Sequence, residues 1–439
     1  MKKVSLLTKD DCGSAMYKSL SALSFLIAGT LFSAAAWSAT PQQLDQAKRI
    51  HERLTGVPPL QADLTAMADL IANGTTDSDG YTGADAAANY AIKTGARKSE
   101  FYTTHLKNFF VEYTNIDANP LPLLNDAAAT MIGMVRDDVP FDQVLYGDIL
   151  YVPAAGYSGS SNANYEAMDQ SHADLSSNSV LVASTQTANS PVTGLESSSP
   201  KFAGVVTTRA WGEAYYSAGT NRRVWRSVAI NFLCRDMEQL KDTTRSPDRV
   251  RQDVTRSPGG DSSIYLSACV GCHSGMDPLV GAYAYYEWTN DDHLTYNTHI
   301  HHDPDNGVLH KFLINAGNFP QGYVTHDDSW ENYWREGKNA ELGWGEATLS
   351  APTGAQPPKV VPPAGVTNTG NGPTTLGEEV ASTSAFSICQ VERVYRDVCK
   401  HEPTDANSAD LKTLQNDFMT NGFNMKSVFI KTAAMCAGD

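Results

Sequence analysis

The chain has 439 residues, of which 41% are hydrophobic and 19% are charged, and its formal net charge at pH 7 is −16. A chain of this length can fill two or three packed domains. Its acidity argues against nucleic acid and anionic lipid surfaces as partners, whereas a basic protein would suit its charge.

The first 39 residues have the pattern of a signal peptide. Four lysines lie in the first 18 residues, and the almost wholly apolar stretch at 20–36 ends in small residues. This stretch is short for a membrane span, so a cleaved export signal at 1–39 is favoured over a membrane anchor. We expect cleavage between Ala36 and Ala39, export to the periplasm or the extracellular space, and no membrane span afterwards.

Residues 40–155 predict an N-terminal helical domain. Apolar residues recur at helical spacing from Leu60 to Ile71, between a Pro-Pro pair and Asn73-Gly74. Proline before such a run and glycine after it are typical of helix boundaries. Similar patterns predict further helices at 83–94, 99–114, 124–136 and 140–148.

Two later segments lack helical periodicity. Residues 156–206 are rich in Ser, Asn, Ala and Thr and predict a surface excursion, while residues 346–376 are rich in Pro, Gly and Thr and predict a linker. The final residues, 377–439, predict a helical C-terminal module with helices at 377–400 and 408–436. The predicted fold class is mainly α.

The most specific motif is the string Cys-Val-Gly-Cys-His at 269–273. In an exported chain this C-x-x-C-H spacing is typical of c-type haem attachment: Cys269 and Cys272 add to the two vinyl groups and His273 binds the iron. The alternatives are a disulfide, a thioredoxin-like redox pair, and half of a zinc site, which would need a second pair of ligands. We predict one covalent haem c in a domain at 207–345.

The residues around the motif predict two short helices. A cap at 261–262 would begin a helix that carries the motif and ends at Ser274-Gly275. The pair Asp277-Pro278 is typical of an N-cap followed by the first helical residue, so it predicts a second helix that continues to Trp288.

A sixth iron ligand must come from a distant segment, because axial ligands lie on opposite faces of the ring. Met276 follows the motif too closely for that role and is expected to pack in the core. The candidates are Met425 and a histidine of the loop after the motif, such as His302; the other histidines there are His299, His301 and His310.

Nine basic side chains gather between Arg222 and Arg256 in an otherwise acidic protein. Arginine suits carboxylates, and a haem carries two propionates. Arg249, Arg251 and Arg256 are the candidates to hold them. The alternative is a solvated helix face with ordinary ion pairs.

Four further cysteines follow the signal peptide, and an even number in an oxidising compartment predicts two disulfides. Cys389 and Cys399 would lie about 15 Å apart on one helix, which is beyond disulfide reach. We therefore favour Cys399 with Cys436 and Cys234 with Cys389. Buried free thiols are the alternative.

Two weaker clusters contain metal-type ligands. Histidines and aspartates between His293 and His310 include Asp303-x-Asp305-x-Gly307, which loosely resembles a calcium loop, and Asp77-Ser78-Asp79-Gly80 is similar. Neither has the full ligand spacing of a calcium or zinc site. A polar loop is expected at the first and a tight turn at the second.

These residues together resemble the planctomycete-type cytochrome c family, in which the C-x-x-C-H string is followed shortly by Asp-Pro-Leu. The resemblance covers about half of the mature chain and implies a secreted haem c protein with a small helical closing module. The similar segments are 269–279 around the motif, Arg-x-x-Trp-Arg at 222–226, Asn-Phe-Leu-Cys at 231–234, Leu-Thr-Gly-Val-Pro-Pro at 54–59, Asp-Val-Pro-Phe-Asp at 138–142, and 386–429.

The sequence thus predicts a secreted mono-haem protein that transfers single electrons between extracytoplasmic partners. One alternative is a haem enzyme such as a peroxidase or an oxygen-dependent oxidase. The other is a binding or assembly protein in which the haem is structural. Two protein ligands on the iron favour the carrier, whereas an open sixth position with a polar pocket favours the enzyme.

Overall fold

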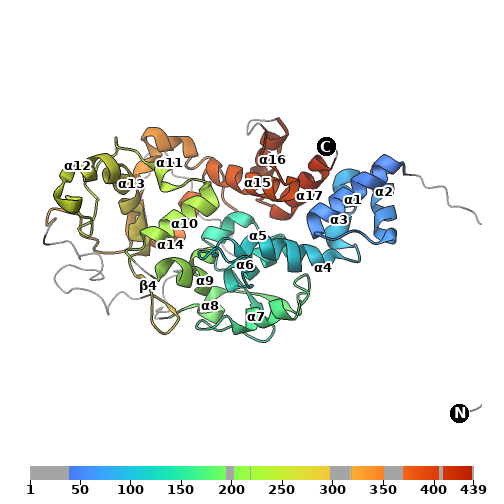
Figure 1. Ribbon diagram of the computed structural model, residues 1–439, viewed down its shortest axis with the longest axis horizontal. Coiled ribbons are helices and arrows are strands. Elements are labelled where there is room, and N and C mark those ends of the chain that lie inside the picture. Colours follow the sequence, from blue (N-terminus) through green and yellow to red (C-terminus); the bar gives the residue numbers. More distant parts are fainter. Residues whose placement is uncertain are drawn as a thin grey trace, which may run out of the picture. The chain divides into compact units, whose positions relative to one another are not determined.

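A computed structural model of the chain describes residues 39–193, 202–217, 219–296, 317, 319–350, 369–404 and 409–437 (Figure 1). Within them the chain is mainly helical, as predicted, and its strands form three small sheets. The predicted signal peptide lies outside the described residues apart from Ala39.

Three helices open the fold: α1 (Pro41–Thr55), α2 (Gln61–Asn73) and α3 (Ala84–Lys93), which pack on one another. A capping box begins α1, because Thr40 Oγ1 accepts from the Gln43 N–H at 3.3 Å and Gln43 Oε1 accepts from the Thr40 N–H at 2.7 Å. Gly74 ends α2 with a φ of +57°, in the left-handed region that glycine favours. The predicted helices at 60–71 and 83–94 are confirmed.

The next two predicted helices also form. The one at 99–114 consists of α4 (Lys98–Glu100), a π-helical segment η1 (Phe101–Leu106) and α5 (Lys107–Val111). The one at 124–136 is α6 (Asp126–Arg136), whose residues are all buried. Its N-cap Asn125 accepts from the Ala128 N–H at 3.0 Å.

The predicted helix at 140–148 is wrong, because only the 3-10 segment η2 (Phe141–Leu145) forms there. Tertiary contacts fix its backbone. Gly204 and Gly377 approach the carbonyls of Val144 and Leu145 so closely that a Cβ on either glycine would overlap the oxygen.

The segment at 156–206 is not simply a surface excursion. It contains the helix α7 (Ala163–Gln170) and the strand β2 (Leu181–Ser184), which pairs antiparallel with β1 (Leu150–Pro153). Tyr165 and Leu181 are buried in the core. Its apolar residues are too widely spaced to give a helical or strand pattern in the sequence, so this packing could not be predicted. The segment also holds α8 (Gln186–Asn189), β3 (Val192–Thr193) and the start of η3 (Gly204–Thr207).

Short elements surround the C-x-x-C-H motif. A small sheet has the order β3-β5-β4, in which β5 (Leu294–Tyr296) is parallel to β3 and antiparallel to β4 (Tyr286–Trp288). The other elements are α9 (Arg209–Trp211), η4 (Gly212–Tyr216), α10 (Arg222–Leu233), α11 (Met237–Leu240), η5 (Pro258–Gly260), α12 (Ser262–Ile264), η6 (Tyr265–Cys269), α13 (Val270–Val280), η7 (Gly281–Tyr283), β6 (Ser329–Glu331), η9 (Tyr333–Arg335) and η10 (Gly337–Leu342).

The two helices predicted around the motif are wrong, because the first does not stop at Ser274-Gly275 and the second neither begins at Asp277 nor reaches Trp288. Helical backbone runs on through α13 to Val280, with Pro278 inside the helix. Gly275 is required for packing, since a Cβ there would overlap the indole of Trp334. Asp277 is a buried ion-pair partner and not an N-cap, and the chain leaves helical structure after η7 to form β4.

The C-terminal module consists of α14 (Gly372–Ala381), α15 (Ser384–Cys399), α16 (Ala409–Thr420) and α17 (Met425–Cys436). The helix predicted at 377–400 is divided at Thr383, which caps α15 by accepting from the Phe386 N–H at 3.0 Å. The predicted linker at 346–376 includes the start of α14, and its residues 351–368 lie outside the described part.

Both disulfides join the pairs that the sequence favoured. Cys234, at the end of α10, is bonded to Cys389 on α15, and their Cα atoms are 5.3 Å apart. Cys399, at the end of α15, is bonded to Cys436 at the end of α17, with Cα atoms 5.6 Å apart. Cys389 and Cys399 lie on one helix, as predicted.

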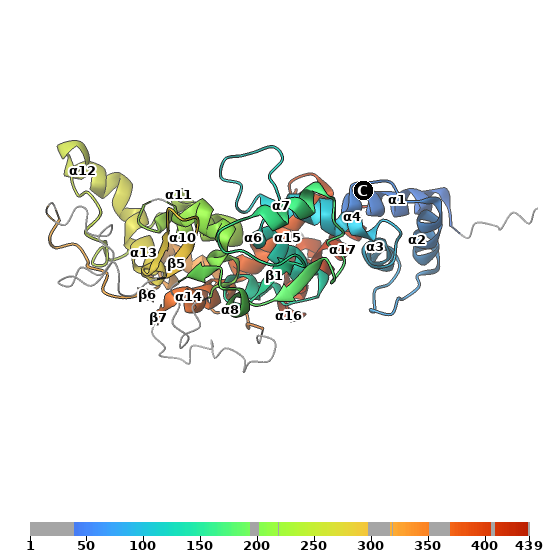
Figure 2. The same cartoon turned by 90° about the horizontal axis from the view of Figure 1, so that it is seen from below.

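One hydrophobic core joins the predicted modules. The described residues form one compact unit by their contacts. The helix α17 packs on α3 and α15, and α15 packs on α10, which in turn packs on α13. Figure 2 shows the same adjacency, with α10 beside α13 and α17 beside α3.

Candidate functional site

The C-x-x-C-H residues lie on one continuous helical stretch formed by α12, η6 and α13. Cys269 ends η6, while Cys272 and His273 lie on the first turn of α13. Residues three and four apart share a helix face, so Cys269 faces the same side as both later residues. Figure 2 shows the start of this stretch standing clear of the neighbouring elements.

Cys269 and Cys272 are the free thiols among the described cysteines, and both are partly exposed. Burial raises the pKa of the Cys272 thiol, and its Sγ lies 3.5 Å from the Met237 carbonyl oxygen. A thioredoxin-like pair needs a lowered thiol pKa, so this environment does not support the redox-pair alternative. The described residues also contain no group of three or more His, Cys, Asp or Glu side chains placed to hold a metal ion, as a zinc site would require.

His273 is oriented by a buried carboxylate one helical turn later. Its Nδ1 lies 3.1 Å from Asp277 Oδ1. Burial, the largest single cause, would raise the pKa of Asp277, but the guanidinium of Arg222 and the bond to His273 together hold this pKa well below its usual range. An ionised carboxylate only accepts hydrogen bonds, so Nδ1 donates, and in the neutral tautomer the lone pair is on Nε2. These residues fit a haem, because Nε2 is left available as a ligand beside two free thiols.

Arg222 connects Asp277 to a second buried carboxylate, Asp253. It donates from Nε to Asp277 Oδ1 at 2.7 Å and from Nη2 to Asp277 Oδ2 at 3.0 Å. It also donates to both oxygens of Asp253, at 2.6 and 2.8 Å. The Arg251 backbone N–H completes the site by donating to Asp277 Oδ2 at 3.1 Å. Sequence analysis missed this cluster, because its members are far apart in the chain and Asp277 resembled a cap.

The three arginines proposed for the propionates have different surroundings. Arg251 is wholly buried: its Nη2 donates to the Thr220 carbonyl at 2.7 Å, and burial and Arg222 lower its pKa to about 10. Its burial and its bond to the backbone do not support the predicted contact with a propionate. Arg249 is ion-paired with Glu331 at 3.0 Å, so its carboxylate partner is already in the protein.

Of the three arginines, Arg256 has the surroundings that best suit contact with a propionate. Its guanidinium stacks over the rings of Tyr265 and Phe319, at 4.2 and 3.8 Å from their centroids. It lines a cavity of about 490 Å³ next to the motif helix, a volume within the usual range of ligand pockets. The cavity is lined by Ser246, Pro247, Asp248, Arg256, Ser262, Tyr265, Leu266 and Phe319.

Apolar side chains near the thiols face outward. Ile264 is 43% exposed and Leu266 is 63% exposed, both within a few residues of Cys269. Cys269 itself packs on Val250, Val254 and Tyr265, a small cluster separate from the main core. Exposed apolar groups beside a cavity mark a surface for an apolar ligand, and the flat edge of a haem has this character.

Of the sixth-ligand candidates, Met425 alone lies among the described residues, and it is not near the motif. Met425 is 2% exposed and begins α17, which packs on α1, α3, α6, α15 and α16 and lies away from α13 in both views (Figures 1 and 2). It is a core residue, so its predicted role is not supported. His302, with His299, His301 and His310, lies outside the described residues. Met276 is buried in the core, as expected.

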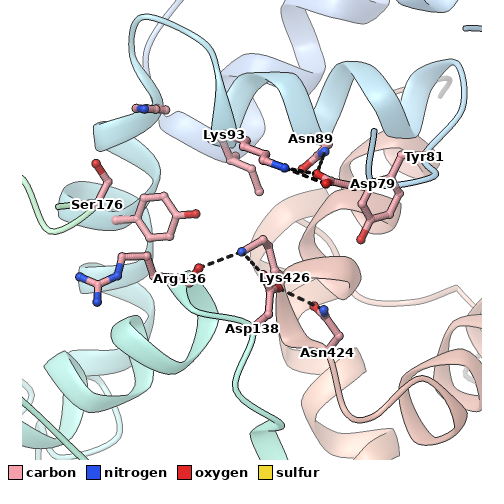
Figure 3. A pocket seen from close by; sticks show the side chains of 12 residues that line it. Asp79, Tyr81, Asn89, Lys93, Arg136, Asp138, Ser176, Asn424 and Lys426 are labelled. Carbon is pink, nitrogen blue, oxygen red and sulfur yellow. Dashed lines mark hydrogen bonds and ion pairs between the residues drawn. The ribbon is translucent and has the colours of Figure 1, made fainter. Parts of the chain in front are cut away.

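A second cavity, of about 520 Å³, has a polar lining (Figure 3). Lys93 bonds both oxygens of Asp79, at 2.6 and 2.7 Å, and Lys426 donates to Asp138 at 2.7 Å. The turn predicted at 77–80 is present, since Asp77 Oδ1 accepts from the N–H groups of Asp79 and Tyr81. No cysteine or histidine is among the residues described as lining this cavity.

No family model, curated protein or solved structure matches this chain. None of the described helices combines the length and the apolar character that crossing a membrane would require.

Proposed function

We propose that this chain is an exported mono-haem c-type protein that transfers single electrons between extracytoplasmic partners. The observation that carries the proposal is the pair of free thiols, Cys269 and Cys272, on one helix face beside His273, while the other described cysteines are paired. The resemblance of this segment to the planctomycete-type cytochrome c family supports it. When bound, the haem would supply a one-electron couple between ferric and ferrous iron.

The chain's residues can perform the attachment without an oxidant. Each thiol would add across one vinyl group: its sulfur bonds to one carbon, and its proton goes to the other. Cys269 and Cys272 would hold the haem by two thioether bonds, and His273, whose Nδ1 bonds Asp277, would offer Nε2 to the iron. Ile264 and Leu266 would be covered, and Arg256 would meet a propionate.

The charge of the chain suits a basic partner. A formal net charge of −16 attracts a positively charged protein over long distances and orients the encounter. The partial exposure of Cys269 and Cys272 would leave a ring edge near the surface, where single electrons can pass between proteins.

A haem enzyme is the second candidate, and the His273–Asp277 hydrogen bond favours it. A carboxylate partner makes a ligating imidazole more basic. A more electron-rich iron is better suited to cleaving an O–O bond, as in peroxidases. Rapid binding of cyanide or peroxide by the ferric protein would support this candidate, and failure to bind them would support the carrier.

The test is expression of the full chain in a bacterium that matures c-type cytochromes, followed by a haem stain on a denaturing gel. We expect a stained band at the size of the chain, which is lost when Cys269 and Cys272 are both replaced by alanine. Cys399→Ala with Cys436→Ala is the matched control, because it also removes two cysteines and should keep the stain. An exported wild-type chain without stain would contradict the proposal.

A further inference from the structure

The histidine of the motif is bonded to a carboxylate that is itself held by an arginine. Asp277 has no solvent exposure, and it accepts from His273 Nδ1, from Arg222 and from the Arg251 backbone N–H. These bonds fix the position of the Asp277 carboxylate. An ordinary surface ion pair is neither fully buried nor held by several donors at once. The second carboxylate on Arg222, Asp253, is equally buried but contacts Arg222 instead of His273.

We infer that Asp277 is a positioning residue that lowers the reduction potential of a haem bound by His273, and that Arg222 limits this effect. The inference rests on the proposed function, since it needs a haem on His273.

The effect begins at the imidazole ring of His273. A hydrogen bond from Nδ1–H to an ionised carboxylate draws the proton away from the ring and makes Nε2 a stronger electron donor. A stronger donor stabilises ferric iron more than ferrous iron, so the potential falls. Burial of Asp277 strengthens the effect, because a charge in a medium of low dielectric is poorly screened.

Arg222 acts in the opposite sense. It bonds both oxygens of Asp277, so it withdraws part of the negative charge that the ring would otherwise meet. Its charge is shared with Asp253, whose two bonds keep it in place. The cluster also contains the guanidinium of Arg251, whose Nε lies 3.5 Å from Asp253 Oδ1, so two carboxylates and two guanidiniums lie together, with Asp277 on the histidine.

This arrangement gives one substitution with a definite sign. Asp277→Asn keeps the shape of the side chain and removes its charge, so the potential should rise. A purely structural role for Asp277 predicts no such rise.

Asp253→Asn is the matched control. It removes the same charge from an equally buried aspartate that is bonded to the same arginine. Asp253 is connected to the histidine through Arg222 and Asp277. If the direct bond to His273 matters, this variant should raise the potential less than Asp277→Asn does.

The experiment is a redox titration of the purified holoproteins, followed by absorption spectroscopy. For Asp277→Asn we expect at least a tenfold shift of the equilibrium towards ferrous iron, which is about 59 mV for a one-electron couple. An unchanged or lower potential, or a shift no larger than that of Asp253→Asn, overturns the inference. If Asp277→Asn does not mature, Asp253→Asn decides, and a potential that fails to rise at all overturns the inference.

The outcomes separate the two proposals. A wild-type chain that carries no haem overturns both of them. A wild-type chain with covalent haem whose potential does not respond as above overturns the role of Asp277 alone and leaves the proposed function intact.

Discussion

Two regions of this molecule contain the same residue types, a His–Asp pair beside two cysteines, and use them differently. On the motif helix, His273 and Asp277 lie near Cys269 and Cys272, and the thiols are free. In the C-terminal module, Asp397 lies 2.7 Å from His105 Nε2 and two residues before Cys399, which is in a disulfide.

The two histidines differ in which ring nitrogen faces the aspartate, and therefore in which nitrogen remains available to bind a ligand. His105 uses Nε2 for its aspartate, and its ring packs between Phe101 and Phe429, at 5.8 and 5.7 Å between centroids. His273 uses Nδ1 for its aspartate, and its side chain is 20% exposed. Cysteines at the ends of two packed helices can pair, whereas cysteines three residues apart face one side together. Arrangement, and not residue type, separates a structural region from a candidate site.

The largest expected effect comes from the cysteines. Removing the Cys399–Cys436 disulfide with two alanines opens a link across 37 residues, which should lower the free energy of unfolding by about 4 kcal/mol. Alanines at Cys269 and Cys272 should change the stability of the haem-free chain by less than about 1 kcal/mol. Urea unfolding followed by circular dichroism measures both. Equal losses in the two variants would remove the distinction between the regions.

The second-largest effect is expected from replacing His105 or His273. His105→Ala should lower the free energy of unfolding by about 2–3 kcal/mol, because it leaves a gap between two phenylalanines and takes the partner from Asp397. It should leave the haem spectrum unchanged. His273→Ala should do the reverse, with an altered spectrum and little loss of stability in the haem-free chain. Unfolding curves and absorption spectra of both variants test this contrast.

A third buried aspartate sharpens the comparison through pH. The pKa values of Asp277 and Asp397 are held below the usual range by Arg222 and His105 against the effect of burial. Asp142 accepts from the Tyr146 hydroxyl and the Ser350 N–H, and its burial raises its pKa to about 6. The folded state therefore binds the Asp142 proton more tightly than the unfolded state does.

The direction of the pH dependence of stability follows from this difference in proton binding. The contribution of Asp142 is fully favourable below its unfolded pKa of about 4 and is lost as pH rises through about 6, at a cost of about 3 kcal/mol. Asp142→Asn should remove that part of the pH dependence between pH 4 and 7. Unfolding curves of both proteins across this range measure it, and parallel curves would show that Asp142 does not titrate in this way.

The smallest effect is expected in the polar cavity of Figure 3. Lys93 and Asp79 are well exposed, so Lys93→Ala should cost less than about 1 kcal/mol. It should change neither the haem stain nor the potential. A change in the potential would mean that this cavity, and not only the motif helix, belongs to the redox site.

Sequence reasoning succeeded where the chemistry was local or limited to a few choices. The helices at 60–71 and 124–136 had clear periodicity and boundary residues, and geometry left few pairings for Cys389 and Cys399. It failed at Asp277, because Asp-Pro is a strong cap signal and only the fold brings Arg222 to that carboxylate across 55 residues. It failed likewise at Arg251, whose burial depends on contacts with Thr220 that no local pattern shows.

The contact between Gly275 and Trp334 has an optical consequence. Trp334 packs on the motif helix two residues from His273, and its ring centre is 5.8 Å from that of Trp225. A haem quenches the fluorescence of a nearby tryptophan by accepting its excitation energy. Both indoles should therefore fluoresce in the haem-free chain and darken once the haem is attached, so ultraviolet emission would follow maturation without any added label.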